Sequence, residues 1–596
     1  MAMECTEASP GAVRGPSEGT PRVRGLLKRW VRRGGTGGGP LLERVLAGRG
    51  LRAGAAAEAF LSPSLRHLHD PSLMLNLDRA AARLLEAARA GEQIAIYGDY
   101  DVDGITATAI LYHTLRAIEP GCSVRTYVPH RLEEGYGLNA EAVAELCTGG
   151  AKVIVSVDCG ITAVGPAKVA RDAGVDLIIT DHHNMPLGEF PGAFALVHPR
   201  LPGGAYPFGE LCGAGVAYKL AWRMCTLACR SERVSQPLRE LLIGDLLAFA
   251  SLGVIADVVP LVDENRVIAS YGLRRVRGAV NEGLRALVKA SHLDSQEVSE
   301  EDVGFKLGPR LNACGRMGHA REAVELLTTA AGPRAVQIAE ELTRLNDERR
   351  KVERAIFEQA CEMVEQVGMH REDRRAIVLA HPGWNAGVVG IVCSRLVEKY
   401  GRPALLMCDH AGLCHGSGRS IDGYSLHGGL EACAAHLTSF GGHDMAAGLR
   451  LESGRLEGFR EAFIGHANER IAPEELTAAV SYDTDVEVGE LTPESVRGLL
   501  RLAPFGRENP PVRLRIPAAR VAMRPQTMGK TNKHLAVQVG GAGTSRLLRV
   551  VGWNWAEHIA HLPVGATLDL LVAPKINEWQ GTVRVEAELI DVRPAR

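Results

Sequence analysis

Short apolar runs alternate with stretches of helical periodicity between residues 91 and 200. Ile94–Tyr97 is the first apolar run, and Val124–Val128, Val153–Val157 and Leu177–Thr180 are further short β-type runs. The stretches between them, Thr106–Ile118, Ala140–Cys147 and Ala163–Ala173, repeat apolar residues every three or four positions. This alternation predicts an α/β domain, in which a parallel sheet carries helices on both faces.

The flanking segments follow other patterns. Helices separated by a loop are expected over residues 41–90, including Leu42–Ala47 and Leu77–Ala90, and residues 206–300 are largely helical in pattern. Residues 308–318 are polar and glycine-bearing, which predicts a loop. One helical pattern then runs over Arg334–Gln366, or about 50 Å at the usual rise per residue. Its many charges favour a connecting strut between domains over a core helix.

Two further domains are expected after this helix. Residues 374–466 resume the strand–helix alternation, with strand Ala376–Leu379, helix Val388–Tyr400 and strand Ala404–Met407, so a second, smaller α/β unit is predicted. Five short β-type runs follow: Val512–Ile516, His534–Val539, Leu547–Trp553, Thr567–Ala573 and Thr582–Val592. Such a series predicts a small β-barrel of the oligonucleotide-binding (OB) type. Residues 1–40, rich in Gly, Arg and Pro, are interpreted as a disordered basic tail.

Composition narrows the classes of protein that remain. The 68 basic and 70 acidic residues give a net charge of −2, so any nucleic-acid track must be a local basic groove. The 13 cysteines include no CxxC pair, which favours reduced, buried thiols in a cytoplasmic protein over a zinc site. No apolar run reaches the ~18 residues that a membrane span needs. We find no secretory signal, and nothing in the chain requires more than a monomer.

Acidic residues follow the predicted strands at the points where the strands end. Asp99, Asp101 and Asp103 follow the first strand, Asp158 the third, and Asp181, His182 and His183 the fourth; a later apolar run ends at Asp257. Because ligands bind beyond the carboxyl ends of the strands in open α/β sheets, these residues are expected to meet at one rim. So many carboxylates repel each other unless cations lie among them. Oxygen ligands with one or two imidazoles suit two divalent ions, Mn²⁺ or Mg²⁺, and two such ions can clamp a phosphoryl group and activate a water. The segment 99–104 also matches the start of a calcium loop, but Ile110 stands where that loop needs a glutamate.

Together these motifs resemble the DHH phosphoesterase superfamily, and within it the single-strand-specific DNA exonucleases. The resemblance rests on Asp181-His182-His183 with its upstream and downstream aspartates, and on the segments Ile96–Gly104, Gly135–Gly137, Cys212–Val216 and Pro309–Arg316. In the later domains it rests on Gly416–Ser420, Phe440–His443 and Ala503–Pro510. The resemblance implies a DHH catalytic domain at 41–332, a connecting helix at 333–368, a DHH-associated domain (DHHA1) at 369–470 and an OB-fold domain at 471–596.

The resemblance also implies the roles of individual residues. Metal ligands would be Asp101, Asp103, Asp158, His182 and Asp257, with Asp158 bridging the ions. Asp99 and Asp181 would orient ligands from the second layer, and His183 would contact the scissile phosphate. The 5′ phosphate and the strand would be held by Arg131, Tyr136, Arg310, Ser417, Arg419 and His443. Lys530, Lys533, Trp553 and Trp579 would extend the track over the barrel, although either tryptophan could equally belong to the barrel core.

The expected activity is a 5′→3′ exonuclease that releases 5′-mononucleotides from single-stranded DNA in repair and recombination. A helicase and a single-strand-binding protein are the partners that such an activity implies. Two alternatives stay open: a DHH phosphodiesterase acting on short oligonucleotides, cyclic dinucleotides or pyrophosphate, and a non-catalytic DNA-binding scaffold. The chain departs from the family pattern at Asn385 and His319, and it ends soon after the barrel, so the extra C-terminal domain of longer relatives is not expected.

Overall fold

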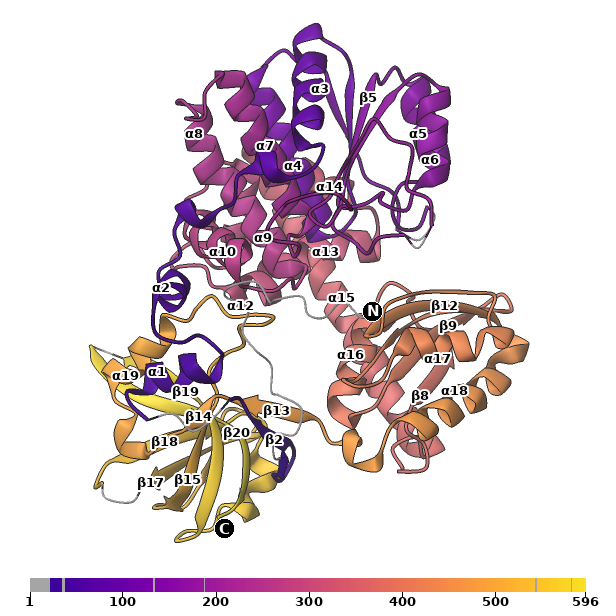
Figure 1. Cartoon of the computed structure of the whole chain (residues 1–596). Coiled ribbons are helices and arrows are strands. Elements are labelled where there is room, and N and C mark those ends of the chain that lie inside the picture. Colours follow the sequence, from indigo (N-terminus) through magenta and orange to yellow (C-terminus); the bar gives the residue numbers. More distant parts are fainter. Residues whose placement is uncertain are drawn as a thin grey trace, which may run out of the picture. The chain divides into compact units, whose positions relative to one another are not determined.

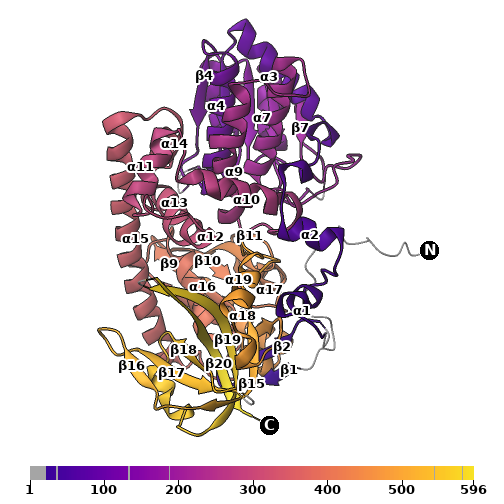
Figure 2. The same ribbon diagram turned by 90° about the vertical axis from the view of Figure 1, so that its left-hand side faces the viewer.

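The computed structural model describes residues 22–34, 38–131, 134–186, 188–541, 544–579 and 581–595. The chain divides into two compact units. The first contains Leu46–Asn346 and Gly498–Pro511; the second contains Asp347–Arg497, Val512–Arg596 and the described residues up to Val45. Helix α15 (Gly332–Val367) begins in the first unit and ends in the second, as one continuous helix in Figure 2. The predicted long connecting helix is therefore confirmed.

The first unit is built on a five-stranded parallel sheet of order β4-β3-β5-β6-β7. Its strands are β3 (Ile94–Tyr97), β4 (Val124–Tyr127), β5 (Val153–Val157), β6 (Asp176–Thr180) and β7 (Ala195–Val197). Every residue of β3 and β5 is buried, because helices cover both faces of the sheet. The predicted doubly wound α/β domain is confirmed.

Helices pack on the two faces of this sheet according to which strand residues point towards them. Helices α5 (Ala140–Thr148) and α6 (Val164–Asp172) form one apolar core with Ala95, Tyr97 and Ile154. The opposite face is covered by α4 (Val102–Ile118) and α7 (Gly213–Cys229), and α3 (Leu77–Ala90) packs against α7 (Figure 1). Because strand side chains alternate between faces, both cores draw on the same short strands.

The rest of the first unit is helical. It contains α2 (Ala55–Leu61), α8 (Leu238–Leu241), α9 (Leu247–Ala256), α10 (Asp263–Val276), α11 (Glu282–Ala290), α12 (Glu300–Asp302), α13 (Gly308–Met317) and α14 (Arg321–Thr328), with π-helical turns at Leu242–Leu246 and Val303–Leu307.

The prediction of a loop over residues 308–318 is wrong, because α13 occupies them. Leu311 and Cys314 are buried on this helix, and Gly315 lets it approach the backbone of Tyr100, where a Cβ would lie 3.1 Å from the carbonyl oxygen. The glycines that suggest a loop here serve close packing of a helix instead.

Residues 498–511 belong to the first unit although the second α/β domain precedes them in the chain. Arg266 of α10 holds this segment, and its guanidinium is 2% exposed and lies 3.9 Å from the ring centre of Phe60. Its nitrogens donate five hydrogen bonds to backbone carbonyls, those of Phe60, Arg501, Leu502, Ala503 and Pro504.

The second unit contains a smaller α/β domain, as predicted. Its sheet has the order β11-β12-β10-β9-β8, in which only β8 and β9 are parallel. The strands are β8 (Ile377–His381), β9 (Ala404–His410), β10 (Leu413–Arg419), β11 (Ser439–Gly442) and β12 (Ala446–Glu452). Helices α16 (Val389–Tyr400), α17 (Leu426–Ala432) and α18 (Leu456–Arg470) accompany them.

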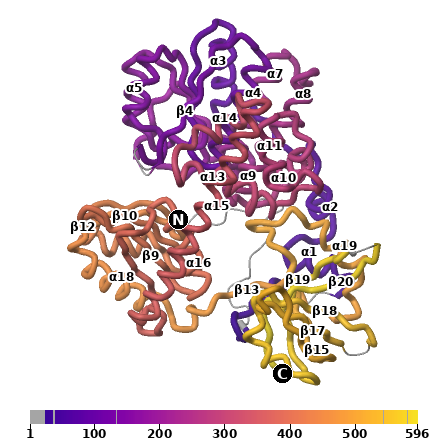
Figure 3. Tube along the Cα trace, turned by 180° about the vertical axis from the view of Figure 1, so that it is seen from behind, coloured from indigo at the N-terminus to yellow at the C-terminus, as the bar shows by residue number. Residues whose placement is uncertain are grey.

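The five predicted barrel strands are present in the same unit (Figure 3). They are β15 (Leu514–Val521), β17 (His534–Gly540), β18 (Leu547–Gly552), β19 (Thr567–Trp579) and β20 (Thr582–Pro594). The short strands β14 (Thr484–Asp485) and β16 (Gln526–Met528) extend the sheet, helix α19 (Pro493–Leu500) precedes β15, and pairing of β15 with β17 closes the barrel.

The prediction that residues 1–40 are disordered is wrong for residues 22–32; residues 1–21 lie outside the described part. Strands β1 (Arg22–Arg24) and β2 (Arg29–Arg32) form a hairpin, and β2 pairs in parallel with β13 (Ala479–Tyr482). Trp30, 1% exposed, donates its indole N–H to Asp591 at 2.7 Å, and the amides of Leu27 and Lys28 donate to the same carboxylate. One buried tryptophan thus anchors a segment whose composition is typical of disorder. Helix α1 (Leu41–Gly48) follows.

Candidate metal centre

The loop after β3 presents three carboxylates in a tight turn. Asp101 caps the N-terminus of α4, since its side chain accepts hydrogen bonds from the amides of Asp103 (2.9 Å) and Gly104 (3.1 Å). A Cβ on Gly104 would lie 2.6 Å from the amide nitrogen of Asp99, so this turn requires glycine. The cap also explains why α4 begins at Val102, four residues before the predicted start.

The loops after β5 and β6 hold one another in place. The amide of Asp158 donates to the carbonyl of Thr180 (3.0 Å), and Asp158 has a positive φ of 65°. The Asp181 carboxylate accepts hydrogen bonds from the amides of Ile161, His182 and His183 and lies 2.7 Å from Nδ1 of His183. These contacts fix the loop after β6 and the position of the His183 ring.

The structure brings the predicted ligands together in three overlapping groups, in each of which the ligand atoms lie within 4.8 Å of one another. The groups are Asp99, Asp101 and Asp158; Asp103, His182 and Asp257; and Asp158, His182 and His183. His182 Nε2 lies 3.1 Å from Asp158 Oδ1, 3.6 Å from Asp257 Oδ2 and 3.8 Å from Asp103 Oδ2. Asp99 thus stands among possible ligands and not behind them.

Asp257 reaches the group by a different route from the one expected. It caps the C-terminus of helix α9 and does not follow a strand. An apolar run of ten residues is ambiguous between a buried strand and a buried helix, and α9 is buried along most of its length.

The electrostatics of the group favour a bound cation. Burial, followed by repulsion from neighbouring carboxylates, raises the pKa of Asp99, Asp158 and Asp257, and that of Asp257 to about 8. Burial lowers the pKa of His182 to about 4, so its imidazole is a neutral potential ligand at neutral pH. Among the described residues, Oδ1 of Asp99, Oδ1 of Asp158 and Nε2 of His182 form no hydrogen bond although all three atoms are buried, and the 3.1 Å approach of Nε2 to Oδ1 of Asp158 lacks hydrogen-bond geometry. Hard oxygen donors with imidazole nitrogen suit Mn²⁺ or Mg²⁺.

The N-terminus of α7 is part of the site, although the sequence alone assigns it no role. The amides of Gly213 and Ala214 donate to the two oxygens of Asp103, at 2.6 and 2.8 Å. A Cβ on Gly213 would lie 2.5 Å from Cβ of Asp158, so the glycine lets the helix approach the site. The available signal was the glycine spacing of Cys212–Val216 ahead of a helical run.

His183 and Tyr136 lie together beside Asp158. The hydroxyl of Tyr136 is 3.0 Å from Nε2 of His183 and 3.3 Å from the carbonyl oxygen of Asp158. Burial lowers the pKa of His183, but its contact with Asp181 and the other carboxylates outweigh this and raise it to about 9. The carbonyl oxygen of His183 also lies 2.9 Å from Nε2 of His198. Nothing in the sequence indicated that His198 is part of this site.

The other predicted residues of the first unit lie near this group or serve the fold. The guanidinium of Arg131 stacks 4.8 Å from the ring centre of Tyr100. Arg310 donates to the carbonyl of Lys306 (2.8 Å) and to Thr343 of α15 (3.2 Å), so it links α13 to the long helix. The ring of His319, a departure from the family pattern, lies 5.4 Å from that of His130.

Within the second unit, Ser417 and Arg419 face the first turn of α16. A Cβ on Gly390 would lie 3.3 Å from Cβ of Ser417 and 3.5 Å from a terminal nitrogen of Arg419. Asn385, the other departure from the family pattern, accepts from the amide of Gly387 (2.8 Å) and closes the turn before this helix. His443, in contrast, is exposed at the end of β11.

On the barrel, Lys530, Lys533 and Trp553 are exposed. Trp553 is 48% exposed and its ring lies 4.9 Å from that of His534, which excludes it from the barrel core. The side chain of Trp579 lies outside the described part of the structure.

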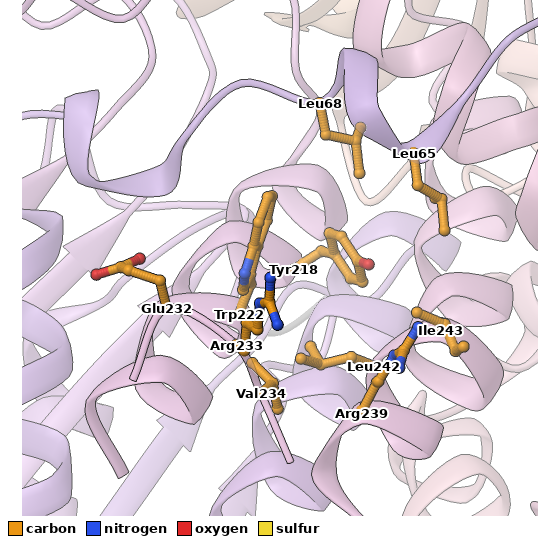
Figure 4. Close-up of a pocket in the computed structure, with 10 residues that line it drawn as sticks. All are labelled: Leu65, Leu68, Tyr218, Trp222, Glu232, Arg233, Val234, Arg239, Leu242 and Ile243. Atoms are coloured by element: carbon orange, nitrogen blue, oxygen red, sulfur yellow. The ribbon is translucent and has the colours of Figure 1, made fainter. Parts of the chain in front are cut away.

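A separate apolar pocket of about 440 Å³ contains none of the predicted site residues. Tyr218 and Trp222 of α7 line it, opposite Leu65 and Leu68 and next to Leu242 (Figure 4). It marks the apolar, C-terminal part of α7, whereas the metal centre lies at the N-terminus of that helix.

Comparisons with known proteins agree with this geometry. Family models match residues 93–249 (DHH family, N-terminal domain), 373–469 (DHHA1 domain) and 482–591 (RecJ OB domain). A parallel sheet with clustered aspartates and a DHH loop, joined to a DHHA1 domain, defines the DHH phosphoesterases.

The particular family follows from whole-chain similarity. The single-stranded-DNA-specific exonuclease RecJ of Bacillus subtilis is 39% identical over 93% of this chain and 68% of its own length. The crystal structure of RecJ from Thermus thermophilus with Mn²⁺ matches 93% of this chain and 76% of its own length, with a TM-score of 0.76 and 30% identity. The structure of the same protein with Mg²⁺ matches 93% of this chain and 74% of its own length, with a TM-score of 0.71 and 28% identity. The chain belongs to the RecJ family. No helix in the described residues has the length and apolar character needed to cross a bilayer.

Proposed function

We propose that this protein hydrolyses single-stranded DNA from its 5′ end and releases 5′-mononucleotides, using two divalent ions, Mn²⁺ or Mg²⁺. One observation carries the proposal: seven predicted site residues converge in overlapping groups of potential ligands, namely Asp99, Asp101, Asp103, Asp158, His182, His183 and Asp257. The family relationship supports it, because the relatives carry the name of single-stranded-DNA-specific exonucleases.

The groups suggest two metal positions that share residues. Asp158 belongs both to the group with Asp99 and Asp101 and to the group with the two histidines, which favours it as the bridging ligand. Divalent ions bound there would polarise the phosphate, activate a water and stabilise the leaving oxygen. The chain's own part is to hold the ligands: Asp181 orients His183, and the α7 amides orient Asp103.

His183 supplies a proton donor beside these ligands. In the metal-free protein, the contact with Asp181 and the other carboxylates outweighs burial and raises the pKa of His183 to about 9, which favours a protonated imidazole. A protonated imidazole donates a charge-assisted hydrogen bond to a phosphate oxygen and stabilises the charge that develops during hydrolysis. Tyr136, in contact with His183, is placed to stack on a base next to the reacting phosphate.

Exonuclease action from one end needs a receptor for that end. Ser417 and Arg419 beside the first turn of α16 combine a hydroxyl and a guanidinium with the N-terminus of a helix, which together suit a terminal phosphate. The exposed Lys530, Lys533 and Trp553 suit the sugar-phosphate backbone and bases of a longer strand. Such a protein would act as a monomer in the cytoplasm, during repair and recombination, with a helicase and a single-strand-binding protein.

The test compares Asp158→Asn with Asp172→Asn, an exposed aspartate of α6, on a 3′-labelled single strand with a 5′ phosphate. We expect Asp158→Asn to lose Mn²⁺-dependent release of mononucleotides by at least 100-fold with the fold retained, and Asp172→Asn to match the wild type. Arg419→Ala should act more slowly on 5′-phosphorylated strands and lose the difference between these and 5′-hydroxyl strands. Cleavage of cyclic dinucleotides in preference to long strands, or DNA binding without turnover in Mn²⁺, would refute the proposed function.

A further inference from the structure

We propose that the buried ion pair between Lys219 and Glu264 is a positioning device for the metal centre, which sets the spacing between Asp103 and Asp257. The inference rests on the proposed two-ion function. It concerns the ion that the group Asp103, His182 and Asp257 would hold. Neither Lys219 nor Glu264 belongs to any group of potential ligands in the described residues.

The pair is fully buried and fully connected. Both side chains are 0% exposed, and the ammonium of Lys219 pairs with Glu264 while it donates to the carbonyl of His69 at 2.7 Å. Glu264 also accepts hydrogen bonds from the amide of His69 (2.7 Å) and from the hydroxyl of Tyr206. A connected buried network of this kind has one low-energy arrangement, so it fixes the elements that carry it.

Lys219 lies on the helix that holds Asp103. The first turn of α7 donates the amides of Gly213 and Ala214 to Asp103, and Lys219 follows about 9 Å further along the same helix. Because a helix is rigid over this distance, the position of Lys219 and that of the amides at Asp103 are linked.

Glu264 lies in the first turn of α10, at the end of the loop that begins at Asp257. The neighbouring Asn265 donates to the carbonyl of Pro260 within this loop (3.1 Å) and to that of Glu210 (2.6 Å). Val258 and Asp263, at either end of the loop, have positive φ values of 58° and 45°. Non-glycine residues keep such conformations only where the surrounding structure imposes them. At the α10 end of the loop, the network around Glu264 holds Asp263 in this conformation.

The energetics favour positioning over simple stabilisation. Replacing a buried ion pair with apolar residues of similar volume often leaves the free energy of unfolding unchanged. A contribution to stability is therefore a weak explanation for this pair. Here it joins the helix that holds one carboxylate to the loop that carries another. We therefore infer that loosening it lets Asp257 move relative to Asp103 and weakens the ion that needs both.

The experiment measures Mn²⁺ binding to the full-length protein, initially metal-free, by calorimetry and by electron paramagnetic resonance, which distinguishes a coupled pair of Mn²⁺ ions from a single one. Lys219→Met is the main variant. Glu264→Gln is the milder one, since its amide oxygen can still accept from the His69 amide and the Lys219 ammonium, while its amide NH2 can donate to the hydroxyl oxygen of Tyr206. Arg402→Met is the matched control, because Arg402 is also buried (5% exposed) and its guanidinium donates to the carbonyls of Met369 and Arg371 (2.8 Å each) within the second unit.

In Lys219→Met we expect the affinity for one of the two Mn²⁺ ions to fall at least tenfold while the other is retained, with loss of the coupled signal. Glu264→Gln should show a smaller fall at the same ion. Arg402→Met should bind both ions with wild-type affinity even if it loses as much thermal stability as Lys219→Met. Wild-type binding of both ions in Lys219→Met or Glu264→Gln, or the same selective loss in Arg402→Met, would overturn the inference. Wild-type protein is assayed in parallel for two-ion binding and strand cleavage; failure there refutes the proposed function instead.

Discussion

The contact between α7 and the metal centre makes Gly213 a position where one methyl group should stop the reaction. A Cβ there would lie 2.5 Å from Cβ, 2.6 Å from Oδ1 and 2.7 Å from Cγ of Asp158. Carbon atoms in contact prefer about 3.5–4.0 Å, so alanine would displace the carboxylate by about 1 Å. A displacement of that size at a reacting centre costs on the order of 100-fold in rate.

Stability should change much less than activity. Extra volume in a packed site costs about 1–3 kcal/mol, while alanine in place of glycine inside a helix contributes up to about 1 kcal/mol. The net loss in the free energy of unfolding of Gly213→Ala should therefore stay near 2 kcal/mol or below, and the variant should fold.

The assay is the steady-state rate of mononucleotide release from single-stranded DNA at saturating Mn²⁺, with the Mn²⁺ affinity and the midpoint of thermal unfolding measured alongside. Gly165→Ala is the matched control, because Gly165 lies in the first turn of α6 and a Cβ there meets nothing within 4 Å. We expect that control to keep the wild-type rate. If Gly213→Ala cleaves DNA at that rate with unchanged Mn²⁺ affinity, Asp158 does not have the bridging role assigned to it.

The charges and hydrogen bonds of the fold support three further predictions. In metal-free protein the pKa of Asp257 is about 8, against about 3.9 in an unfolded chain. Between these values the folded state binds more protons than the unfolded state, so the free energy of unfolding should fall as pH rises from about 4 to 8. Calorimetry in buffers of different ionisation enthalpy should show that Mn²⁺ binding releases protons over this range. Constant proton release from pH 5 to 9 would contradict that pKa. Arg266→Met should lower the free energy of unfolding by about 3–5 kcal/mol, because buried carbonyls lose charged donors, and hydrogen exchange should speed up selectively over residues 498–511. Unchanged exchange there would show that Arg266 does not hold this segment. Asp591→Ala should lower the free energy of unfolding by about 2–4 kcal/mol, because it leaves the buried Trp30 indole and two amides unpaired. The readout is proteolysis of the N-terminal hairpin. A hairpin as resistant as in the wild type would show that the contact between Trp30 and Asp591 does not anchor it.

The sequence predicts the parallel sheet and the residues of its rim because both depend on local patterns. Runs such as Val153–Val157 are apolar except for one serine, and each is followed by a polar residue where the strand must end. The convergence of Asp103, Asp158 and His182 then follows from the geometry of parallel strands.

The errors arise where long-range packing decides. Helix α13 has the glycines of a loop, but Gly308 and Gly315 serve close contacts that no local pattern reveals. Asp257 is reached through a buried helix that reads equally well as a strand. The hairpin at residues 22–32 depends on Asp591, more than 500 positions away in the sequence. Likewise, the amides of Gly213 and Ala214 act through their backbone, which side-chain identity does not report.

The return of residues 498–511 to the first unit has a consequence for synthesis on the ribosome. Translation proceeds from the N-terminus, and domains generally fold as units while the chain emerges. Arg266, however, obtains four of its five carbonyl acceptors from residues made only after the whole second α/β domain. Until that later stretch of polypeptide has left the exit tunnel, the Arg266 guanidinium lacks four of its five acceptors, and the catalytic unit cannot complete its fold.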